Sequence, residues 1–508
     1  MSRTAGFAIA LGALLGFAIS VQGCAEEEPP KACNAEAQSG CSEGLECRVG
    51  VDGEPGCFCS SEQHTGCGEG LDCYELDQAD PECFCSVDRQ TGCDEGLACE
   101  LVPGEGAECF DPVTVAGSVF DLATSTPVEG ARVVARDANN AALSGVAITD
   151  ANGNYSLQVP TPRNPDGTLL PNPVTLRVDA AGYLTFPRAP RVAVPVDTGM
   201  ASGTPLVVDT TATDVGLIAM PDSDGLGSIA GVVAGDRPRG TVVVAGGASG
   251  VADYDGSYAV FNVPPGSVAV QGYKIGDQLE PTTADVRSAE LTEGVDIARI
   301  GDATAYVGGK IEIVNPGNGT NTSVVLIVEE TFEPTFASGE SPPGLRVGDV
   351  SGDFRFELVP DGNYVVLAAF ENDFLVRDPD TAIGGTDIVH MTVAGESTDL
   401  SQSFKVTGSL EVVSPDAEQV VNGTPTFVWE DDSGEDHYEI VVYDAFGNLV
   451  WEKLDVPGVS GDREVEVPYE GPALAQGLLY QFRATSIKQG GSPISRTEDL
   501  RGVFVYGG

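Results

Sequence analysis

Three short acidic stretches hold the side chains whose spacing suggests chemistry: "TDANGNYSL" (149–157), "ADYDGSYAV" (252–260) and "GDVSGDFRF" (348–356). Carboxylates in such a stretch could bind calcium, contact a sugar or cap a turn. An EF-type calcium loop requires Gly at its sixth position and Glu at its twelfth. Counted from the first Asp of each D-x-x-G, Gly is fourth and the twelfth residues are Thr161, Pro264 and Pro360. We therefore expect turns, with calcium at the domain ends as the alternative.

Turn chemistry explains the same residues without a ligand. An Asp side chain can accept hydrogen bonds from backbone N–H groups that follow it. Glycine adopts positive φ more readily than other residues, and we expect this conformation at Gly153, Gly256 and Gly352. Each stretch would then join two strands of a hairpin, because alternating apolar residues follow it directly.

Catalytic constellations are not apparent in the sequence. The histidines are His64, His390 and His437, and no H-E-x-x-H or G-x-S-x-G motif occurs. No base stands in a recognisable pattern with a nucleophile. We predict no catalytic residue, no metal ligand and no cofactor. Catalysis by an unrecognised pair of carboxylates is the alternative.

Residues 33–110 form three copies of a 26-residue repeat with the spacing C-x7-C-x5-C-x9-C-F. An even set of cysteines in an exported chain predicts disulfides, and four per unit allow three pairings that the sequence does not distinguish. We expect pairing within each unit, because short loops close at low entropic cost. Zinc is disfavoured, because close C-x2-C pairs are missing. The units resemble small EGF-like disulfide modules. The predicted disulfide residues are Cys33, Cys41, Cys47, Cys57, Cys59, Cys67, Cys73, Cys83, Cys85, Cys93, Cys99 and Cys109.

The N-terminal residues 1–23 have the pattern of an export signal. Arg3 precedes an apolar stretch at 5–21, which is short for a membrane span. The stretch ends in "VQGC" (21–24), which resembles the bacterial lipobox, although Gln22 is unusual at its position. The resemblance implies that Cys24 is acylated and that residues 24–32 form a lipid anchor and tether. An ordinary secretory signal with an incidental cysteine is the alternative.

Net charge excludes one class of partner. The chain of 508 residues has 77 Asp and Glu against 26 Lys and Arg, a formal charge of −51. Such a chain repels phosphate backbones, so we do not expect nucleic acid as a partner.

From residue 113 onward, alternating apolar runs separated by Gly, Pro, Asn and Asp predict β-sandwiches. Residues 113–222 resemble the carboxypeptidase regulatory-like domain, a prealbumin-like sandwich that accompanies a peptidase without being catalytic. The signature residues are Gly117, the segment "PVEGARV" (127–133), Thr149, Asp150, Gly153, Tyr155, Gly182 and Tyr183. A degenerate second copy is expected at 223–301 and a third at 302–406, because both repeat the acidic stretch and a Val-Pro-x-Gly corner.

Residues 407–508 differ from these copies. A strand with Trp429, an "FGN" turn and Tyr480 in "YQFR" resemble a fibronectin type III-like sandwich. The resemblance implies that Trp429 lies in the core of this domain.

The predicted fold class is mainly β, with disulfide-rich N-terminal repeats (33–112) followed by a string of β-sandwich domains. The sequence predicts a non-enzymatic, lipid-anchored protein of the bacterial cell envelope, on the periplasmic or outer face of the outer membrane. It would act as a structural or adhesive scaffold, in which the repeats carry a rod of sandwiches outward from the membrane. Carbohydrate binding is the alternative, and a glycan or another surface protein is the expected partner besides the membrane.

Overall fold

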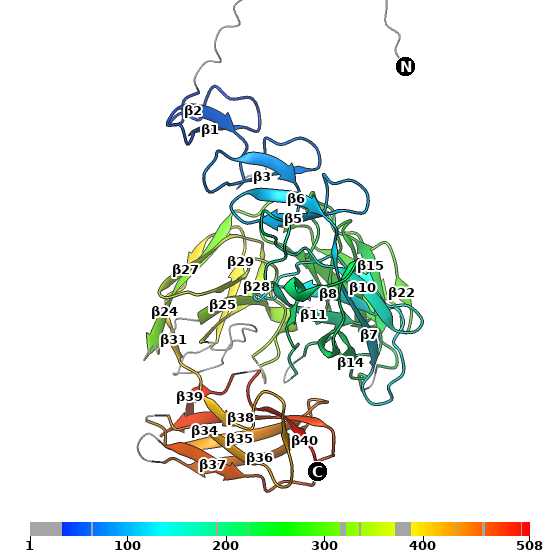
Figure 1. Cartoon of the computed structure of the whole chain (residues 1–508), viewed down its shortest axis with the longest axis vertical. Coiled ribbons are helices and arrows are strands. Elements are labelled where there is room, and N and C mark those ends of the chain that lie inside the picture. Colours follow the sequence, from blue (N-terminus) through cyan, green and yellow to red (C-terminus); the bar gives the residue numbers. More distant parts are fainter. Residues whose placement is uncertain are drawn as a thin grey trace, which may run out of the picture.

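A computed structural model describes residues 33–61, 65–188, 191–221, 223–314, 322–334, 337–370, 388–432, 434–459, 463–498 and 500–508 (Figure 1). The signal segment 1–23, the tether 24–32 with Cys24, and His64 lie outside these residues. The described chain consists of strands and three single-turn 3-10 helices, which confirms the mainly β fold class. In the described part, no helix has the length and apolarity needed to cross a membrane.

Each N-terminal repeat contains one antiparallel hairpin. These hairpins are β1 (Glu46–Val49) with β2 (Pro55–Phe58), β3 (Leu71–Tyr74) with β4 (Glu82–Cys85), and β5 (Ala98–Val102) with β6 (Gly106–Phe110). A two-stranded hairpin is at best marginally stable alone, so other contacts must stabilise each repeat.

The first sandwich consists of two four-stranded sheets. In one sheet, the central strand β7 (Val113–Asp121) pairs antiparallel with β10 (Asn154–Gln158) and parallel with β13 (Leu206–Val208) and β14 (Val215–Leu217). The other sheet has the order β12 (Val196–Asp197), β11 (Pro173–Asp179), β8 (Arg132–Arg136), β9 (Ala147–Ile148). The 3-10 helices η1 (Thr198–Met200) and η2 (Thr211–Thr213) lie between the later strands.

The second and third sandwiches repeat this connectivity. In the second, β15 (Gly227–Val232) pairs antiparallel with β18 (Ser257–Val263) and parallel with β22 (Leu291–Thr292). In the third, β24 (Ala305–Val314) pairs antiparallel with β27 (Asp353–Val359) and parallel with β30 (Thr398–Asp399) and β31 (Phe404–Thr407).

Each of these two sandwiches has a second, four-stranded sheet. In the second sandwich its order is β17 (Ala248–Val251), β16 (Val242–Ala245), β19 (Gly266–Tyr273), β21 (Thr282–Val286). In the third sandwich its order is β26 (Arg346–Gly348), β25 (Thr322–Val328), β28 (Gly362–Phe370), β29 (Val389–Val393). The second sandwich adds the pair β20 (Asp277–Leu279) and β23 (Arg299–Asp302), and the third adds the 3-10 helix η3 (Glu329–Thr331).

The C-terminal sandwich has a different topology. Its three-stranded sheet has the order β32 (Val412–Ser414), β34 (Thr426–Glu430), β37 (Glu464–Pro468). Its six-stranded sheet has the order β33 (Gln419–Val421), β40 (Val503–Tyr506), β38 (Leu479–Lys488), β35 (His437–Asp444), β36 (Leu449–Pro457), with β39 (Ser492–Arg496) also paired to β38. Trp429 is fully buried between the sheets, with its ring 5.5 Å from that of Tyr438.

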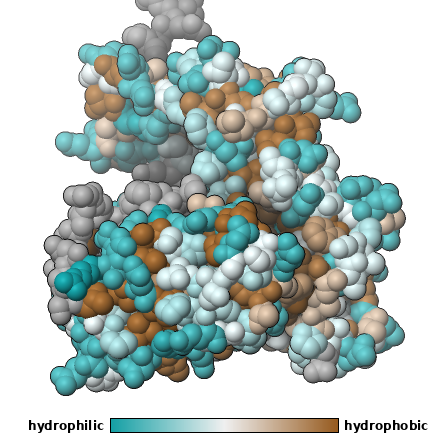
Figure 2. All heavy atoms as spheres, turned by 60° about the horizontal axis from the view of Figure 1, so that its bottom comes forward, coloured by the Kyte–Doolittle hydropathy of each residue, from teal (hydrophilic) through white to brown (hydrophobic). Residues whose placement is uncertain are grey.

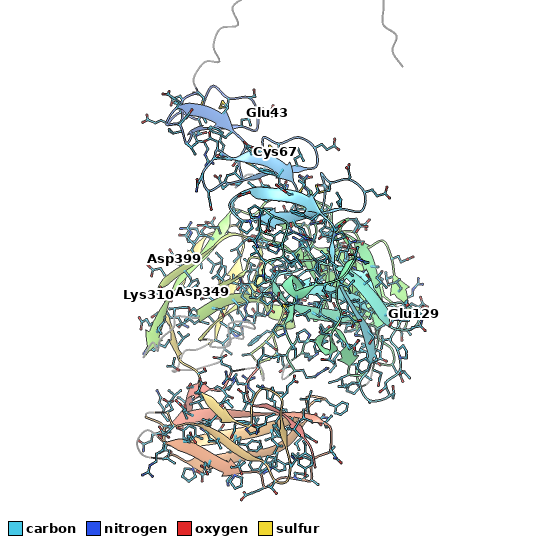
Figure 3. All side chains as sticks on the ribbon, in the orientation of Figure 1. Glu43, Cys67, Glu129, Lys310, Asp349 and Asp399 are labelled. Atoms are coloured by element: carbon cyan, nitrogen blue, oxygen red, sulfur yellow. A yellow bond between two sulfur atoms is a disulfide. The ribbon has the colours of Figure 1, made fainter. Side chains whose placement is uncertain are left out.

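The domains lie in three tiers (Figure 1). The repeats occupy one end and the C-terminal sandwich the other, whereas the first three sandwiches lie side by side between them. Figure 3 shows the breadth of the middle tier: Glu129 lies at one side of it, and Lys310 and Asp399 lie at the opposite side. The expected end-to-end rod is therefore interrupted by a block of three sandwiches, since these three share buried surfaces.

Several strands of the block are buried on both faces. Every residue of β16 and of β25 is buried, as are six of the seven residues of β11. On β16, Val243 packs into the second sandwich, whereas Val242 and Val244 pack into the core of the third. Tyr273 of β19 joins the same core, 6.0 Å from the ring of Tyr364. The second and third sandwiches therefore share a hydrophobic core.

Candidate functional site: charged joints around a central cavity

All twelve cysteines of the repeats form disulfides, each within one repeat. The first Cys pairs with the third and the second with the fourth, as in Cys33–Cys47 and Cys41–Cys57. The later repeats follow with Cys59–Cys73, Cys67–Cys83, Cys85–Cys99 and Cys93–Cys109. Within the described residues, the groups with metal-ligand spacing are three cysteine triads drawn from these same bonds. A disulfide sulfur is not a thiolate, so these triads are not zinc sites.

Successive repeats pack through one leucine. A Cβ added to Gly66 would lie 2.7 Å from Leu45 Cδ2 and 2.8 Å from Cys59 Cα, and Gly92 is covered in the same way by Leu71. Leu45 and Leu71 therefore fill a gap that only glycine leaves open in the next repeat. Leu97, the equivalent residue of the third repeat, is 40% exposed.

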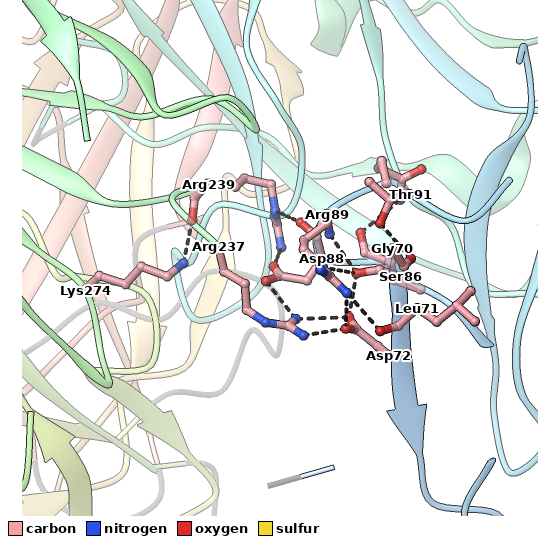
Figure 4. A network of polar contacts seen from close by, with 12 residues as sticks. Gly70, Leu71, Asp72, Ser86, Asp88, Arg89, Thr91, Arg237, Arg239 and Lys274 are labelled. Carbon is pink, nitrogen blue, oxygen red and sulfur yellow. Dashed lines mark hydrogen bonds and ion pairs between the residues drawn. The ribbon is translucent and has the colours of Figure 1, made fainter. Parts of the chain in front are cut away.

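The second and third repeats are joined to the second sandwich by a cluster of charges that we call the repeat joint (Figure 4). Asp72 binds Arg89 at 2.7 Å and also contacts Arg237, which reaches it from the sandwich. Asp88 pairs with Arg239, whose Nε donates to the Asp88 carbonyl at 3.0 Å. These contacts connect segments about 150 residues apart, so they fix the repeats to the block.

Electrostatics in the repeat joint favour the charged forms of both carboxylates. Burial acts to raise the pKa of Asp72, but hydrogen bonds from Arg237 and Ser86 outweigh it and hold the pKa below its usual range. Burial likewise opposes the charge of Asp88, and Arg239 with Lys274 lowers its pKa. The ammonium of Lys274 donates to the Arg239 carbonyl at 2.7 Å. Both carboxylates therefore remain ionised at neutral pH.

The third repeat also docks on the first sandwich. Glu100 is fully buried and pairs with Arg163. The Arg163 guanidinium lies 4.7 Å from the centre of the Phe110 ring and donates to the Asp111 carbonyl at 2.7 Å. Burial raises the pKa of Glu100, and the contact with Arg163 opposes that shift.

The three sandwiches meet at a second charged cluster, which we call the central junction: Arg136, Arg177, Asp179, Ser249 and Glu340. Arg177, fully buried on β11, forms two hydrogen bonds with Asp179 and pairs with Glu340 of the third sandwich. It also donates to Ser249 of the second sandwich at 3.0 Å. Arg136 of β8 pairs with Glu340 at 3.0 Å. One carboxylate from the third sandwich thus satisfies two guanidinium groups of the first.

Charge pairing at the central junction offsets a large desolvation penalty. Burial acts to raise the pKa of Glu340, but Arg177 and Arg136 lower it to about 2. Burial lowers the pKa of Arg136, which Glu340 opposes. The junction is therefore a stable ion cluster only while all its members are present, because a lone buried charge is costly.

Direct hydrogen bonds add to the contacts between the first two sandwiches. Asn262 at the Val-Pro-x-Gly corner accepts from the Gly182 N–H at 2.7 Å and donates to the Tyr183 carbonyl at 2.8 Å. Asp253 accepts from the Val146 N–H at 3.0 Å. Gly182 and Tyr183 thus contribute to a domain interface.

The acidic stretches differ from one another. Asp150 accepts from the N–H groups of Asn152 and Asn154 at 2.8 and 2.9 Å, and Gly153 has φ of +77°. Gly256 has φ of +81°, and Asp255 accepts from Ser257 N–H. In these two stretches the backbone N–H groups satisfy the carboxylates, as the turn interpretation predicts.

The third stretch corrects our expectation for its glycine. Gly352 is not in the positive-φ region, and Asp349, which Figure 3 labels, takes φ of +59° in its place. A Cβ added to Gly352 would meet no atom within 4 Å. The positive-φ position therefore falls earlier in the turn than the shared spacing suggested, and carboxylates near these stretches form no close group in the described part of the chain.

Between the three sandwiches lies a cavity of about 540 Å³, the central cavity. Its lining includes Arg136 and Glu340 of the central junction, and residues from all three sandwiches. The lining includes apolar side chains such as Ile327 and Phe332 and hydroxyls such as Ser249 and Ser341. This cavity is within the size range of small-molecule sites.

Neither described histidine lines the cavity. His390 on β29 is exposed, with Nδ1 2.9 Å from Glu329 Oε1. His437 on β35 has Nδ1 3.3 Å from Asp436 Oδ2. Neither histidine contacts a nucleophile in the hydrogen bonds of the described residues.

Our sequence analysis did not find the charged residues of the repeat joint and the central junction, although the apolar runs of the sequence contain a signal for them. Apolar and polar residues alternate in a strand with one solvent-exposed face. This alternation is missing from the runs "RVVAR" (132–136), "TVVVA" (241–245) and "SVVLIV" (323–328). Near-continuous apolar runs are typical of strands buried on both faces. The arginines within or beside such runs therefore had to meet a carboxylate.

Comparison with known proteins gave no family. No family model matches the sequence, and no curated protein matches it. Similar solved structures include the Bacillus anthracis TIE protein, at 12% identity, covering 88% of this chain and 75% of that chain with a TM-score of 0.15.

Two further structures show the same level of similarity. BcpA, the major pilin subunit of Bacillus cereus, is 12% identical, with 57% of this chain and 98% of that chain covered and a TM-score of 0.14. A tetra-tandem repeat in the extending region of a large adhesion protein is 14% identical, with 77% and 99% covered and a TM-score of 0.14. TM-scores of this size do not indicate a shared arrangement of domains.

Proposed function

We propose that this chain is a non-enzymatic scaffold protein of the bacterial cell envelope, held to the membrane by an acylated Cys24. The observation that carries the proposal is the pair of charged joints. They fix the disulfide repeats to the second sandwich and the three sandwiches to one another. Buried charges that pair between distant segments favour one relative orientation over others. Such a body suits a spacer that presents surfaces at a fixed distance and angle from its anchor.

The exposed surface supports a spacer rather than a sugar-stacking face. In the described part of the chain, the exposed large hydrophobic side chains are aliphatic, and none is Phe, Tyr or Trp. On the face shown in Figure 2, apolar residues lie in separate groups among hydrophilic ones. Among these described residues, no exposed aromatic ring offers a stacking surface for a sugar.

The scaffold role is tested by measuring the rigidity of the repeat joint. We expect small-angle X-ray scattering of residues 25–508 to fit one elongated conformation. The double variant Arg237→Gln, Arg239→Gln should broaden the distribution of distances, because Asp72 and Asp88 lose their partners in the sandwich. The matched control is Arg287→Gln, whose side chain is 79% exposed and bonded to Glu290. A wild-type protein that already samples many orientations of its repeats would contradict the scaffold role.

The anchor is tested separately in cells. Wild-type protein should fractionate with membranes and enter the detergent phase, whereas Cys24→Ser protein should not carry lipid. Mass spectrometry of the mature N-terminal peptide decides between the two. A mature protein with an unmodified Cys24 thiol, or one that begins after residue 24, would contradict lipid anchoring but would leave the scaffold role intact.

A further inference from the structure

The central cavity contains a cation without a carboxylate partner. Arg191 lines the cavity, donates to the Gly216 carbonyl at 2.9 Å, and stacks its guanidinium 4.9 Å from the centre of the Phe186 ring. Among the described residues it forms no ion pair, whereas Arg136 and Arg177 each pair with Glu340. Burial lowers the pKa of Arg191 to about 10, so the guanidinium remains charged at neutral pH.

A second polar group in the cavity also lacks a partner. Ser341 lines the cavity and is 8% exposed, and its Oγ has no hydrogen-bond partner. Most buried hydroxyl groups are bonded, and an unbonded one costs free energy. The Ser341 hydroxyl can donate one hydrogen bond and accept others. A ligand with a hydroxyl group would satisfy it.

Among the described residues, no ion pair joins Arg191 to a carboxylate of the cavity lining. Asp179 is bonded to Arg177, and Glu340 is shared by Arg177 and Arg136. Glu330 and Glu333 also line the cavity: Glu330 is exposed to solvent, and Glu333 has an interaction of its own. The cavity therefore combines an uncompensated positive charge, a free hydroxyl and an apolar wall, within a chain whose overall charge is −51.

We propose that the central cavity binds a small hydroxylated carboxylate of the uronic acid class, with its carboxylate on Arg191 and a hydroxyl on Ser341. Guanidinium and carboxylate form strong, charge-assisted hydrogen bonds. The site lies at the meeting point of three sandwiches, so it exists only while the central junction holds them together. Ligand binding is a function beyond the scaffold role.

Binding is measured by isothermal titration calorimetry on residues 25–508. The probes are D-galacturonate, its trisaccharide trigalacturonate, and D-galactose as the neutral analogue. We expect an acidic probe to bind at least tenfold more tightly than galactose, because only the acid can pair with Arg191. Binding of the monosaccharide alone indicates a free uronic acid, and binding of the trisaccharide indicates the end of a polymer.

Four variants test where the acid binds. Arg191→Gln should weaken the binding at least tenfold, Ser341→Ala should weaken it severalfold, and Arg287→Gln at an exposed site should leave it unchanged. Hydrogen exchange at β11 and β25 checks that Arg191→Gln has not unfolded the block. Arg191→Lys retains the positive charge, so it should restore part of the affinity that Arg191→Gln loses. Equal binding of galactose, binding that survives Arg191→Gln, or failure of both acidic probes to bind would each overturn the proposal.

Discussion

The repeats and the three-sandwich block stabilise their short strands in opposite ways. In the described repeats, the largest buried apolar cluster contains Cys85, Cys99 and Ala107. The first sandwich alone has seventeen buried apolar residues in its core. A repeat of 26 residues is too small to bury such a core, so covalent bonds replace it. The block needs no cross-link, because it buries apolar surface on both faces of its sheets.

Charge is distributed in a way that complements this difference. Residues 33–112 include nineteen acidic residues but only Arg48 and Arg89 as basic ones. The cations that pair with the repeat carboxylates across these contacts therefore come from the sandwiches, as Arg163, Arg237 and Arg239. A covalent array with an acidic surface is thus held by a block that supplies the arginines.

Breaking the central junction should have the largest effect on the block. Glu340→Gln leaves Arg136 and Arg177 without their shared carboxylate, and loss of one partner of a buried ion cluster costs about 3–5 kcal/mol. We expect hydrogen exchange at β8, β11 and β25 to accelerate, while the repeats remain protected. The matched control Glu290→Gln removes an exposed partner of Arg287 and should cost less than about 0.5 kcal/mol. Equal effects of the two variants would contradict the role of the junction.

The same junction predicts a pH dependence. The pKa of Glu340 is about 2 in the folded protein, below its value of about 4.3 in an unfolded chain. The unfolded chain therefore binds the proton first as the pH falls, so the stability from Glu340 is complete above about pH 4.5 and is lost toward pH 2. In Glu340→Gln, the dependence of block unfolding on pH between 4.5 and 2 should be smaller than in the wild type.

Removing one disulfide bond should destabilise the repeats and leave the stability of the block unchanged. The double variant Cys67→Ser, Cys83→Ser opens a loop with a sequence separation of 16 residues, which costs about 3 kcal/mol. We expect faster hydrogen exchange in residues 59–84 and unchanged exchange at β16 and β25. Exchange that accelerates equally in the sandwiches would show that the two regions do not differ as proposed.

A smaller effect separates two glycines that share one motif. Gly153→Val places a β-branched residue at φ of +77°, with its Cβ 2.4 Å from the Val119 carbonyl oxygen. We expect thermal unfolding to show a loss of about 1–3 kcal/mol. Gly352→Val is the matched control, since Gly352 has neither positive φ nor an atom within 4 Å of a new Cβ. A loss at Gly352 as large as that at Gly153 would contradict the observed turn geometry.

The sequence alone determined the features that depend on local spacing. The repeat period, the strand-rich texture and the buried Trp429 follow from residues near one another in the chain, and the structure bears out the β fold that they imply. Local spacing also indicated the turn at Gly153, because Asp150 and the N–H groups it caps lie within four residues. The four cysteines of each repeat allow three possible disulfide pairings, and the folded repeat adopts the one that joins the first Cys to the third and the second to the fourth.

Only the tertiary structure decided how the domains meet. Arg177 and Glu340 are 163 positions apart, and Asp72 and Arg237 are 165 apart, so no local pattern could pair them. The sequence of Gly352 resembles that of Gly153, yet its backbone differs because Asp349 takes the left-handed conformation. The uninterrupted apolar runs, which our sequence analysis did not use, are typical of strands covered on both faces, but they do not tell what covers them. The packing of the three sandwiches decides what covers these strands, because an interface and its charge pairs and cavities form only when separately folded surfaces come together.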